Sequence, residues 1–317
     1  MSVLLLVVQT LVPLVVLVAV GAALLRFGFM TDVQRRFLDR LVYWVGLPAL
    51  LVAKVAEAGS IDASIGWVVM ALALATLVAA GLSFLAWRLM SGRHEALGVM
   101  VQGGLRGNLA FVGLPVIELA GGGDRALAIG AIAIAPTVTL YNLIAVSALS
   151  WGKSAASLSG VALLRQTAWS IVANPLIIAC VVGVVLAVGN LRLPDVVMHS
   201  LNLVGQPAGP LALMSLGGAL VVYRIRGHLA EASVSTVFKL IACPAVAAAL
   251  VWLLGLNRDE AFALLILAAT PTAVASYVLV TQVGGDEGLA ASIIALTTLG
   301  SVLSLGAAIA LAASISA

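Results

Sequence analysis

Two apolar stretches of this chain are broken by glycine, proline and polar residues. The first reads Gly104-Leu105-Arg106-Gly107-Asn108-Leu109-Ala110-Phe111-Val112-Gly113-Leu114-Pro115, and the second reads Ala268-Ala269-Thr270-Pro271-Thr272-Ala273-Val274-Ala275-Ser276-Tyr277. Unwound backbone inside a bilayer leaves N–H and C=O groups without partners, at several kcal/mol each, so it persists only where protein, water or a ligand satisfies them. Broken helices at corresponding positions of two halves are typical of a secondary transporter's binding site.

The composition indicates that the chain lies in a membrane. Of its 317 residues, 63% are hydrophobic and 9% are charged, and the mean hydropathy is +1.20. A soluble domain carries roughly 25% charged residues. Because apolar segments of the roughly 20 residues needed to cross a bilayer fill nearly the whole sequence, we predict an all-α polytopic membrane protein without a soluble domain.

Charged and turn-rich breaks divide the chain into ten predicted transmembrane helices. They are Leu4–Leu25, Leu38–Ala58, Ile65–Met90, Glu95–Leu119, Ala126–Trp151, Ala168–Val188, Val196–Tyr223, Val234–Leu254, Ala261–Val283 and Leu289–Ile315. The first is too long for a signal peptide and has no basic residue before it, so it is read as a retained helix.

The basic residues predict the orientation, because cytoplasmic loops carry an excess of Lys and Arg. One side would carry Arg26, Arg35, Arg36, Arg40, Arg88, Arg93, Lys153, Arg165, Arg224, Arg226 and Lys239, and the other Lys54, Arg125, Arg192 and Arg258. This asymmetry places both termini outside the cytoplasm, and we expect a bacterial inner (plasma) membrane. The net charge of +3 needs no nucleic-acid partner, because basic loops facing lipid headgroups explain it.

The prolines indicate an internal repeat. Pro13 and Pro175 are as far apart as Pro48 and Pro210. The halves implied are residues 1–151 and 168–317, each with five spans, joined by a cytoplasmic linker at 152–167. Because five is odd, the second half must enter the membrane from the opposite side, which gives two inverted repeats of the kind that transporters use.

Four stretches, taken in order, resemble the auxin efflux carrier family within the bile-acid-symporter-like superfamily. They are Gly107–Pro115, Asn174-Pro175-Leu176, Pro210-Leu211-Ala212-Leu213 and Thr270–Tyr277. The resemblance implies that helices 4 and 9 cross at their unwound centres and that small organic anions are carried. It also implies that helices 3–5 and 8–10 move, elevator-like, against a scaffold of helices 1, 2, 6 and 7 that can form a homodimer.

The first break predicts an anion site. A helix that restarts after it exposes free N–H groups and the positive end of a dipole worth about half a charge, and Arg106 adds a full charge that suits a carboxylate. The predicted substrate-binding residues are Arg106, Asn108, Gly113, Pro115, Thr270, Pro271, Thr272, Ser276 and Tyr277, with Gln102, Asn142 and Gln206 as weaker candidates. For Arg106, a permanent pair with Glu118 or another carboxylate is the alternative.

One position departs from the family pattern, because Ala275 stands where relatives often have an asparagine. The second break therefore offers hydroxyls alone, and no aspartate lies in the middle of a span. A proton relay normally uses an intramembrane acid or histidine, whereas His94, His199 and His228 fall near predicted interfaces. Export driven by the membrane potential fits best, and coupling to a proton remains open.

Enzyme chemistry finds little support in the sequence. The string Gly121-Gly122-Gly123-Asp124 matches intramembrane aspartyl proteases, but their mechanism needs a second intramembrane aspartate. We see no metal or nucleotide motif, and read Cys180 and Cys243 as small apolar residues. We therefore predict no enzyme, no cofactor and no metal.

The predicted function is a secondary transporter of a small organic anion, working by alternating access at the helix 4/9 crossing. The family suggests dicarboxylates such as malate or malonate, or indole-type monocarboxylates. The alternatives are an anion channel or neutral-solute carrier, and a membrane receptor or sensor without transport.

Overall fold

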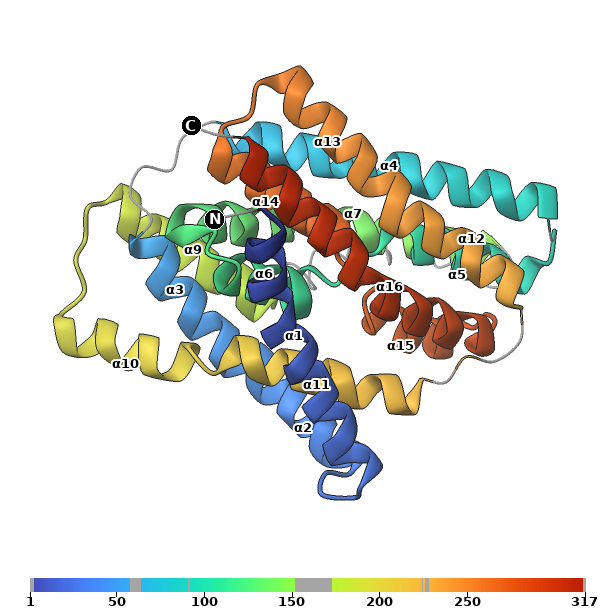
Figure 1. The fold of residues 1–317 in the computed structure, drawn as a ribbon, viewed down its shortest axis with the longest axis horizontal. Helices are drawn as coiled ribbons and strands as arrows, with labels where there is room; N and C mark the ends of the chain where they lie inside the picture. The colour runs from blue at the N-terminus through green and yellow to red at the C-terminus, as the bar shows by residue number, and fades with distance from the viewer. Residues whose placement is uncertain are drawn as a thin grey trace.

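The computed structural model describes residues 3–57, 64–90, 92–151, 173–223, 225 and 228–315, and within these ranges it is helical throughout (Figure 1). The helices are α1 (Val3–Arg26), α2 (Asp32–Leu41), η1 (Val42–Gly46), α3 (Leu47–Glu57), α4 (Ile65–Met90), α5 (His94–Leu105), η2 (Leu109–Gly113), α6 (Leu114–Leu119), α7 (Gly123–Trp151), α9 (Pro175–Val188), α10 (Asp195–Gly205), α11 (Ala208–Val222), α12 (Leu229–Val237), η3 (Phe238–Ala242), α13 (Cys243–Leu254), α14 (Arg258–Ala269), α15 (Ala275–Val283) and α16 (Glu287–Ser314). The η segments are π-helical turns.

Five helical stretches of the described chain are long and apolar enough to cross a membrane, namely Ile65–Met90, Gly123–Leu149, Asp195–Val222, Leu229–Leu254 and Glu287–Ser314. The third comprises α10 and α11, and the fourth comprises α12, η3 and α13. Large apolar side chains also face outward, as in Leu253 and Leu303, which are 79% and 80% exposed. Exposed apolar surface marks contact with a membrane or a partner, so both observations agree with a polytopic membrane protein.

The helix bounds differ most from the predicted spans at three places. The second span begins earlier, at Asp32, because Thr31 and Gln34 form a capping box there. The seventh is two helices, α10 and α11, with Gln206 and Pro207 between them. The eighth begins at Leu229. The predicted linker at 152–167 and the start of the sixth span lie outside the described residues.

Each π-helical turn is explained by a proline two residues after it. The N–H of Leu47 donates to the carbonyl of Val42, and the same five-residue step joins Leu114 to Leu109 and Cys243 to Phe238. Pro48, Pro115 and Pro244 come next. Proline has no N–H, and its ring pushes away the carbonyl four residues back, so the preceding turn widens by one residue.

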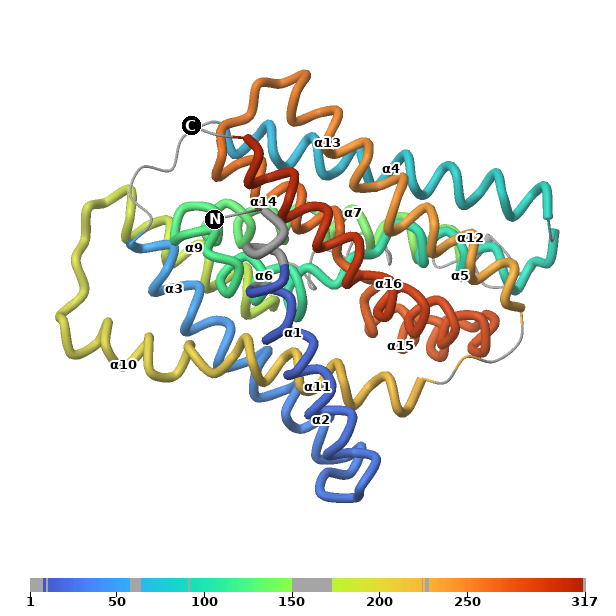
Figure 2. Tube along the Cα trace, in the orientation of Figure 1, coloured from blue at the N-terminus to red at the C-terminus, as the bar shows by residue number. Residues whose placement is uncertain are grey.

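The helices form two groups (Figure 1). In one, α1 packs along α11 and α3 packs along α9 and α10. In the other, α14 lies at the centre, in contact with α4, α7, α13 and α16, and every residue of α14 from Ala261 to Ala269 is buried. The interruption between α14 and α15 spans residues 270–274, and the chain path in Figure 2 shows α10 and α11 running end to end. The interrupted helices therefore lie where the two groups meet.

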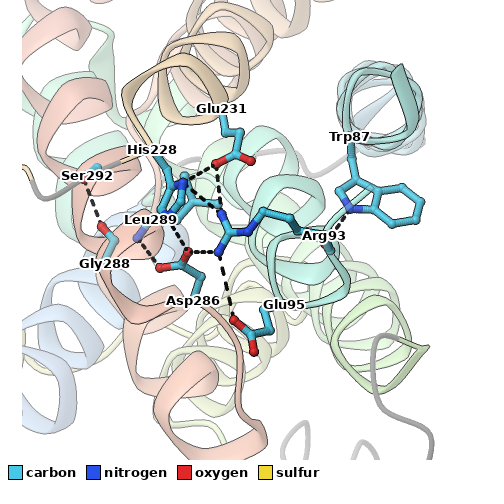
Figure 3. A network of polar contacts seen from close by, with 9 residues as sticks. All are labelled: Trp87, Arg93, Glu95, His228, Glu231, Asp286, Gly288, Leu289 and Ser292. Carbon is cyan, nitrogen blue, oxygen red and sulfur yellow. Dashed lines mark hydrogen bonds and ion pairs between the residues drawn. The ribbon is translucent and has the colours of Figure 1, made fainter. Parts of the chain in front are cut away.

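An ionic network ties the second group together at one end (Figure 3). Arg93 lies before α5 and contacts Asp286, before α16, at 2.8 Å and Glu231, in α12, at 3.3 Å. His228 lies within 3.5 Å of both carboxylates. Partial burial alone would raise the pKa of Asp286, but hydrogen bonds from the Leu289 N–H and from Arg93 outweigh it and hold that pKa below its usual value.

Candidate functional site

The two sequence breaks lie against each other and exchange backbone hydrogen bonds. Gly107 and Thr272 form an isolated antiparallel bridge. The N–H of Asn108 donates to the carbonyl of Pro271, and the N–H of Ala273 donates to the carbonyl of Arg106, both at 2.8 Å. Each unwound segment thus satisfies groups that the other leaves without a helical partner, which is the condition for irregular backbone at membrane depth.

A new half-helix starts on each side of this crossing. The carbonyl of Asn108 accepts the N–H groups of Val112 and Gly113, both at 3.1 Å, at the start of η2. Val274 is the residue from which α15 starts, and at neither start does a side chain cap the first N–H groups. The first N–H groups of a helix have no partner within it, and both half-helices present a positive dipole end. In α15 the N–H groups of Ser276 and Tyr277 donate to the carbonyls of Ala273 and Val274, at 2.9 and 3.0 Å, so the start of η2 is the better source of donors.

These two helix starts line one cavity of about 230 Å³. Its walls are Arg35 and Asp39 from α2, Asn108 and Phe111 at the first break, Ala212, Ser215, Leu216 and Ala219 from α11, and Ala273, Val274, Ala275 and Val278 at the second break. The cavity therefore lies between α2 and α11 on one side and the crossing on the other. We call it the crossing pocket.

The wall formed by α2 and α11 is polar and was not expected from the sequence. Arg35 is 3% exposed and contacts Asp32 and Asp39, both at 2.8 Å. The Ser215 hydroxyl donates to the other oxygen of Asp39. The prediction that Arg35 lies in a cytoplasmic connection is wrong, because α2 starts before the apolar span and turns this arginine inward. The spacing of Asp32, Arg35 and Asp39, three and four residues apart, is the signal that could have revealed the cluster.

Arg106 does not line the crossing pocket. Its N–H continues α5 by donating to the carbonyl of Gln102 at 2.9 Å, and its guanidinium lies within electrostatic range of the Tyr141 hydroxyl. One guanidinium nitrogen, Nη1, is buried without a hydrogen-bond partner. No ion pair joins Arg106 to Glu118 or to any other carboxylate of the described residues, so the permanent pair is not formed.

The predicted residues of the second break hold the crossing together. The Thr270 hydroxyl donates to the carbonyl of Leu267 at 2.7 Å and caps the end of α14. Pro271 supplies the carbonyl that Asn108 uses. The Thr272 hydroxyl reaches the carbonyl of Gly103 at 2.7 Å, and its N–H donates to the Thr297 hydroxyl at 3.1 Å. Thr270 and Thr272 are buried, and none of the three lines the crossing pocket.

Ser276, Tyr277 and Gln102 join α15 to its neighbours. The Gln102 side-chain amide donates to the carbonyl of Ser276 at 3.3 Å, while the Ser276 hydroxyl is buried without a partner. The Tyr277 hydroxyl donates to Glu287 at 3.2 Å, and its ring lies 4.8 Å from that of Tyr223, the residue after α11. Tyr277 thus connects the two helix groups beside the crossing pocket.

The other predicted site residues take packing positions or lie apart from the pocket. A side chain on Gly113 would meet Leu267 at 2.7 Å, which explains the glycine. Pro115 is buried in α6 and follows the π-helical turn η2. Asn142 is half-buried in α7, and Gln206 is exposed between α10 and α11. Of the predicted residues, Asn108 is the one that lines the crossing pocket.

Within the described residues, no three His, Cys, Asp or Glu side chains gather in a way that could hold a metal ion. The acidic groups nearest the crossing pocket, Asp32 and Asp39, are engaged by Arg35.

Two interrupted helices that meet at their unwound segments are typical of one class of protein, the membrane transporters built from broken helices. Comparison with known proteins gives the family. The model of the membrane transport protein family matches residues 6–308, and the chain belongs to this family, the auxin efflux carriers. A similar protein is an uncharacterized transporter of Methanocaldococcus jannaschii, 24% identical over 300 residues that cover 91% of this chain and 93% of the relative.

These matches confirm the predicted family and make the protein a membrane transporter. The family consists of transporters and not, in general, of enzymes.

Proposed function

We propose that this transporter carries a small organic anion and binds it in the crossing pocket. One observation carries the proposal: the uncapped starts of both half-helices, η2 and α15, line the same cavity with Asn108. Half-helix N-termini point at anionic groups of substrates in transporters built from broken helices, and a helix start attracts anions through its free N–H groups and its dipole.

The opposite wall, formed by α2 and α11, limits the positive charge that the pocket offers to a substrate. Arg35 offers a guanidinium, but Asp32 and Asp39 already engage it, so the wall carries no excess positive charge. A bound carboxylate would rely first on the helix starts and Asn108, and would compete with Asp39 for Arg35. Arg106 lies outside the pocket and affects a bound substrate at most through the electric field of its charge.

The size of the pocket favours a short substrate. At about 230 Å³ it is smaller than the roughly 300–1,000 Å³ typical of sites for drug-sized ligands. Phe111 provides one aromatic surface, stacked on Tyr43 with ring centres 6.3 Å apart. We expect mono- or dicarboxylates of a few carbons to bind better than indole-type acids.

Alternating access would move one helix group against the other. Under the proposed inverted repeat, helix 1 corresponds to helix 6 and helix 2 to helix 7. The contacts of α1 with α11 and of α9 with α3 are then equivalent to each other, which supports the two-fold relation of residues 1–151 and 168–317. Helices 1, 2, 6 and 7 would be the scaffold, able to form a homodimer, and helices 3–5 and 8–10 the elevator-like moving part in a bacterial inner membrane with outside termini.

The test is ligand-induced stabilisation of the purified transporter by a panel of short carboxylates. A ligand at 100 times its dissociation constant should stabilise the protein by about 2.7 kcal/mol. We expect Asn108→Ala to lose the stabilisation and Asn142→Ala, whose side chain lies outside the pocket, to retain it. If no carboxylate raises the melting temperature of the wild type, the anion proposal fails. Saturable counterflow in proteoliposomes then separates a carrier from a channel, and binding without flux would indicate a receptor.

A further inference from the structure

We propose that the side chain of Lys239 is a built-in cation, occupying the place at the crossing where other broken-helix transporters bind a coupling sodium ion. In such transporters, unwound carbonyls and the C-terminal ends of half-helices coordinate Na⁺. The inference rests on the proposed carrier function and adds that this carrier needs no metal cation.

Lys239 lies in the π-helical turn η3, in the middle of the helix from Leu229 to Leu254. The prediction that it belongs to a cytoplasmic connection is wrong, because its side chain is 0% exposed. Its Nζ donates to the carbonyl of Ala268 at 2.8 Å, in the last turn of α14. A side chain on Gly107, at the first break, would come within 3.4 Å of the same nitrogen. The amine thus lies beside both breaks at once.

No carboxylate balances this amine among the described residues. Its other polar neighbour is the sulfur of Cys243, 4.0 Å away, and Arg106, at the same crossing, also forms no ion pair in the part of the chain that is described. An isolated charge is costly to bury unless something compensates it. The C-terminus of a helix carries about half a negative charge, so the end of α14 is the group that compensates Lys239.

The chain itself occupies the carbonyls that a sodium ion would use. At the end of α14, Leu267 accepts the Thr270 hydroxyl at 2.7 Å, Ala268 accepts Lys239, and Ala269 accepts the Ser304 hydroxyl at 2.8 Å. Three consecutive carbonyls therefore have donors from side chains. A metal ion at this position would have to displace them, and the ammonium already supplies its charge.

The experiment measures carboxylate uptake into proteoliposomes in sodium, potassium or choline salts. Wild-type rates should agree within about twofold, because an ion that does not bind shifts no equilibrium. In choline salt, the uptake rate of Lys239→Ala should be about tenfold or more below that of the wild type, as expected when a hydrogen bond to a charged group is removed. Sodium or methylammonium should restore part of it. Lys54→Ala is the matched control, since Lys54 pairs with Asp124 at 3.0 Å away from the crossing.

Melting temperatures provide a second readout that does not need transport. NaCl, compared with choline chloride, should raise the melting temperature of Lys239→Ala and leave that of the wild type unchanged. Wild-type uptake or melting that depends on sodium overturns the proposal, even if Lys239→Ala does not fold. A Lys239→Ala variant that transports like the wild type in choline also overturns it, as does a loss of transport with no response to any cation. Absence of carboxylate uptake by the wild type counts against the carrier function instead, and the melting comparison then decides the role of Lys239.

Discussion

Arg106 and Asn108 are two residues apart, yet the structure gives them different surroundings. The break turns the chain between them, so that Asn108 lines the crossing pocket while the Arg106 side chain lies outside it, within electrostatic range of Tyr141 in α7. Composition and spacing could predict that both lie at a break, because glycine, proline and polar residues in an apolar run are local signals. They could not predict which side of the crossing each faces, because that depends on the partner segment more than 160 residues away.

Substitution of Asn108 should impair transport without unfolding the protein. Asn108→Ala removes the pocket's amide, and one hydrogen bond to a charged group is worth about 1.5–3 kcal/mol, so substrate affinity should fall by about tenfold or more. The backbone bonds of Asn108 do not involve its side chain, so the melting temperature should stay near that of the wild type. Uptake equal to the wild type would exclude the crossing pocket as the substrate site.

Substitution of Arg106, which lies on the side of the crossing that faces away from the pocket, tests whether its charge contributes to substrate binding. Arg106→Gln keeps hydrogen-bonding capacity and removes the charge. Because this side chain does not line the crossing pocket, carboxylate affinity measured by ligand-induced melting should remain within about threefold, less than 1 kcal/mol. A tenfold weaker affinity would mean that Arg106 reaches the substrate.

Helices α1 and α11 show how glycines set the spacing of whole elements. A side chain on Gly21 would overlap the backbone of Met214, and one on Gly217 would overlap the backbone of Val18. Small residues let membrane helices approach closely enough for their backbones to pack. The sequence predicted both helices, but the pairing of these two glycines depends on the way the elements cross.

Adding a methyl group at this contact should destabilise the protein. Gly217→Ala forces α1 and α11 apart, at a typical cost of about 1–3 kcal/mol for overpacking. The control is Gly81→Ala in α4, where no atom lies within 4 Å of the added carbon. Melting curves in the same detergent should show a lower midpoint for Gly217→Ala alone, and equal midpoints would argue that α1 and α11 do not pack in this way.

The network around Arg93 should make the packing of α5, α12 and α16 sensitive to acid. Because the folded-state pKa of Asp286 is lowered, its contribution to stability is present above the unfolded value of about 3.9 and is lost as the pH falls through the lower folded value. Asp286→Asn should therefore lower the melting temperature at pH 7 and have a smaller effect below about pH 4. Asp195→Asn, at the start of α10, is the control, and equal effects at both pH values would contradict the assignment.

At the scale of the whole molecule, the two helix groups meet through α6, α11 and the crossing. A cysteine at 209 in α11 and one at 115 in α6 would have β-carbons about 3.4 Å apart, close to the separation of about 3.5–4.5 Å found in disulfides. If the groups move as proposed, the oxidised pair Pro115→Cys/Gly209→Cys should stop uptake, and reduction should restore it to the level of the two single variants. Uptake that persists after complete oxidation would rule out this movement.

Much of this architecture was accessible from the sequence because membrane helices and their breaks are local features. The broken helices follow from apolar runs and from Gly, Pro and polar residues within them, and the family follows from the resemblance of four stretches of the sequence. The burial of Lys239 was not accessible, because charge counting places a basic residue near a loop unless a tertiary partner is known, and its partner is the end of α14. Arg35 differs, because its partners Asp32 and Asp39 lie three and four residues away in the same helix and could have been read from the spacing.

The backbone exchange at the crossing lets the cargo of such a carrier change over evolutionary time while the fold is kept. The bonds between Asn108 and Pro271 and between Ala273 and Arg106 use main-chain atoms alone, so the frame places little demand on the side chains that face the pocket. Ala273 and Ala275 are small residues at that surface. Descendants can therefore acquire larger or more polar side chains there, and with them new substrates, while the helices that carry the site keep their places.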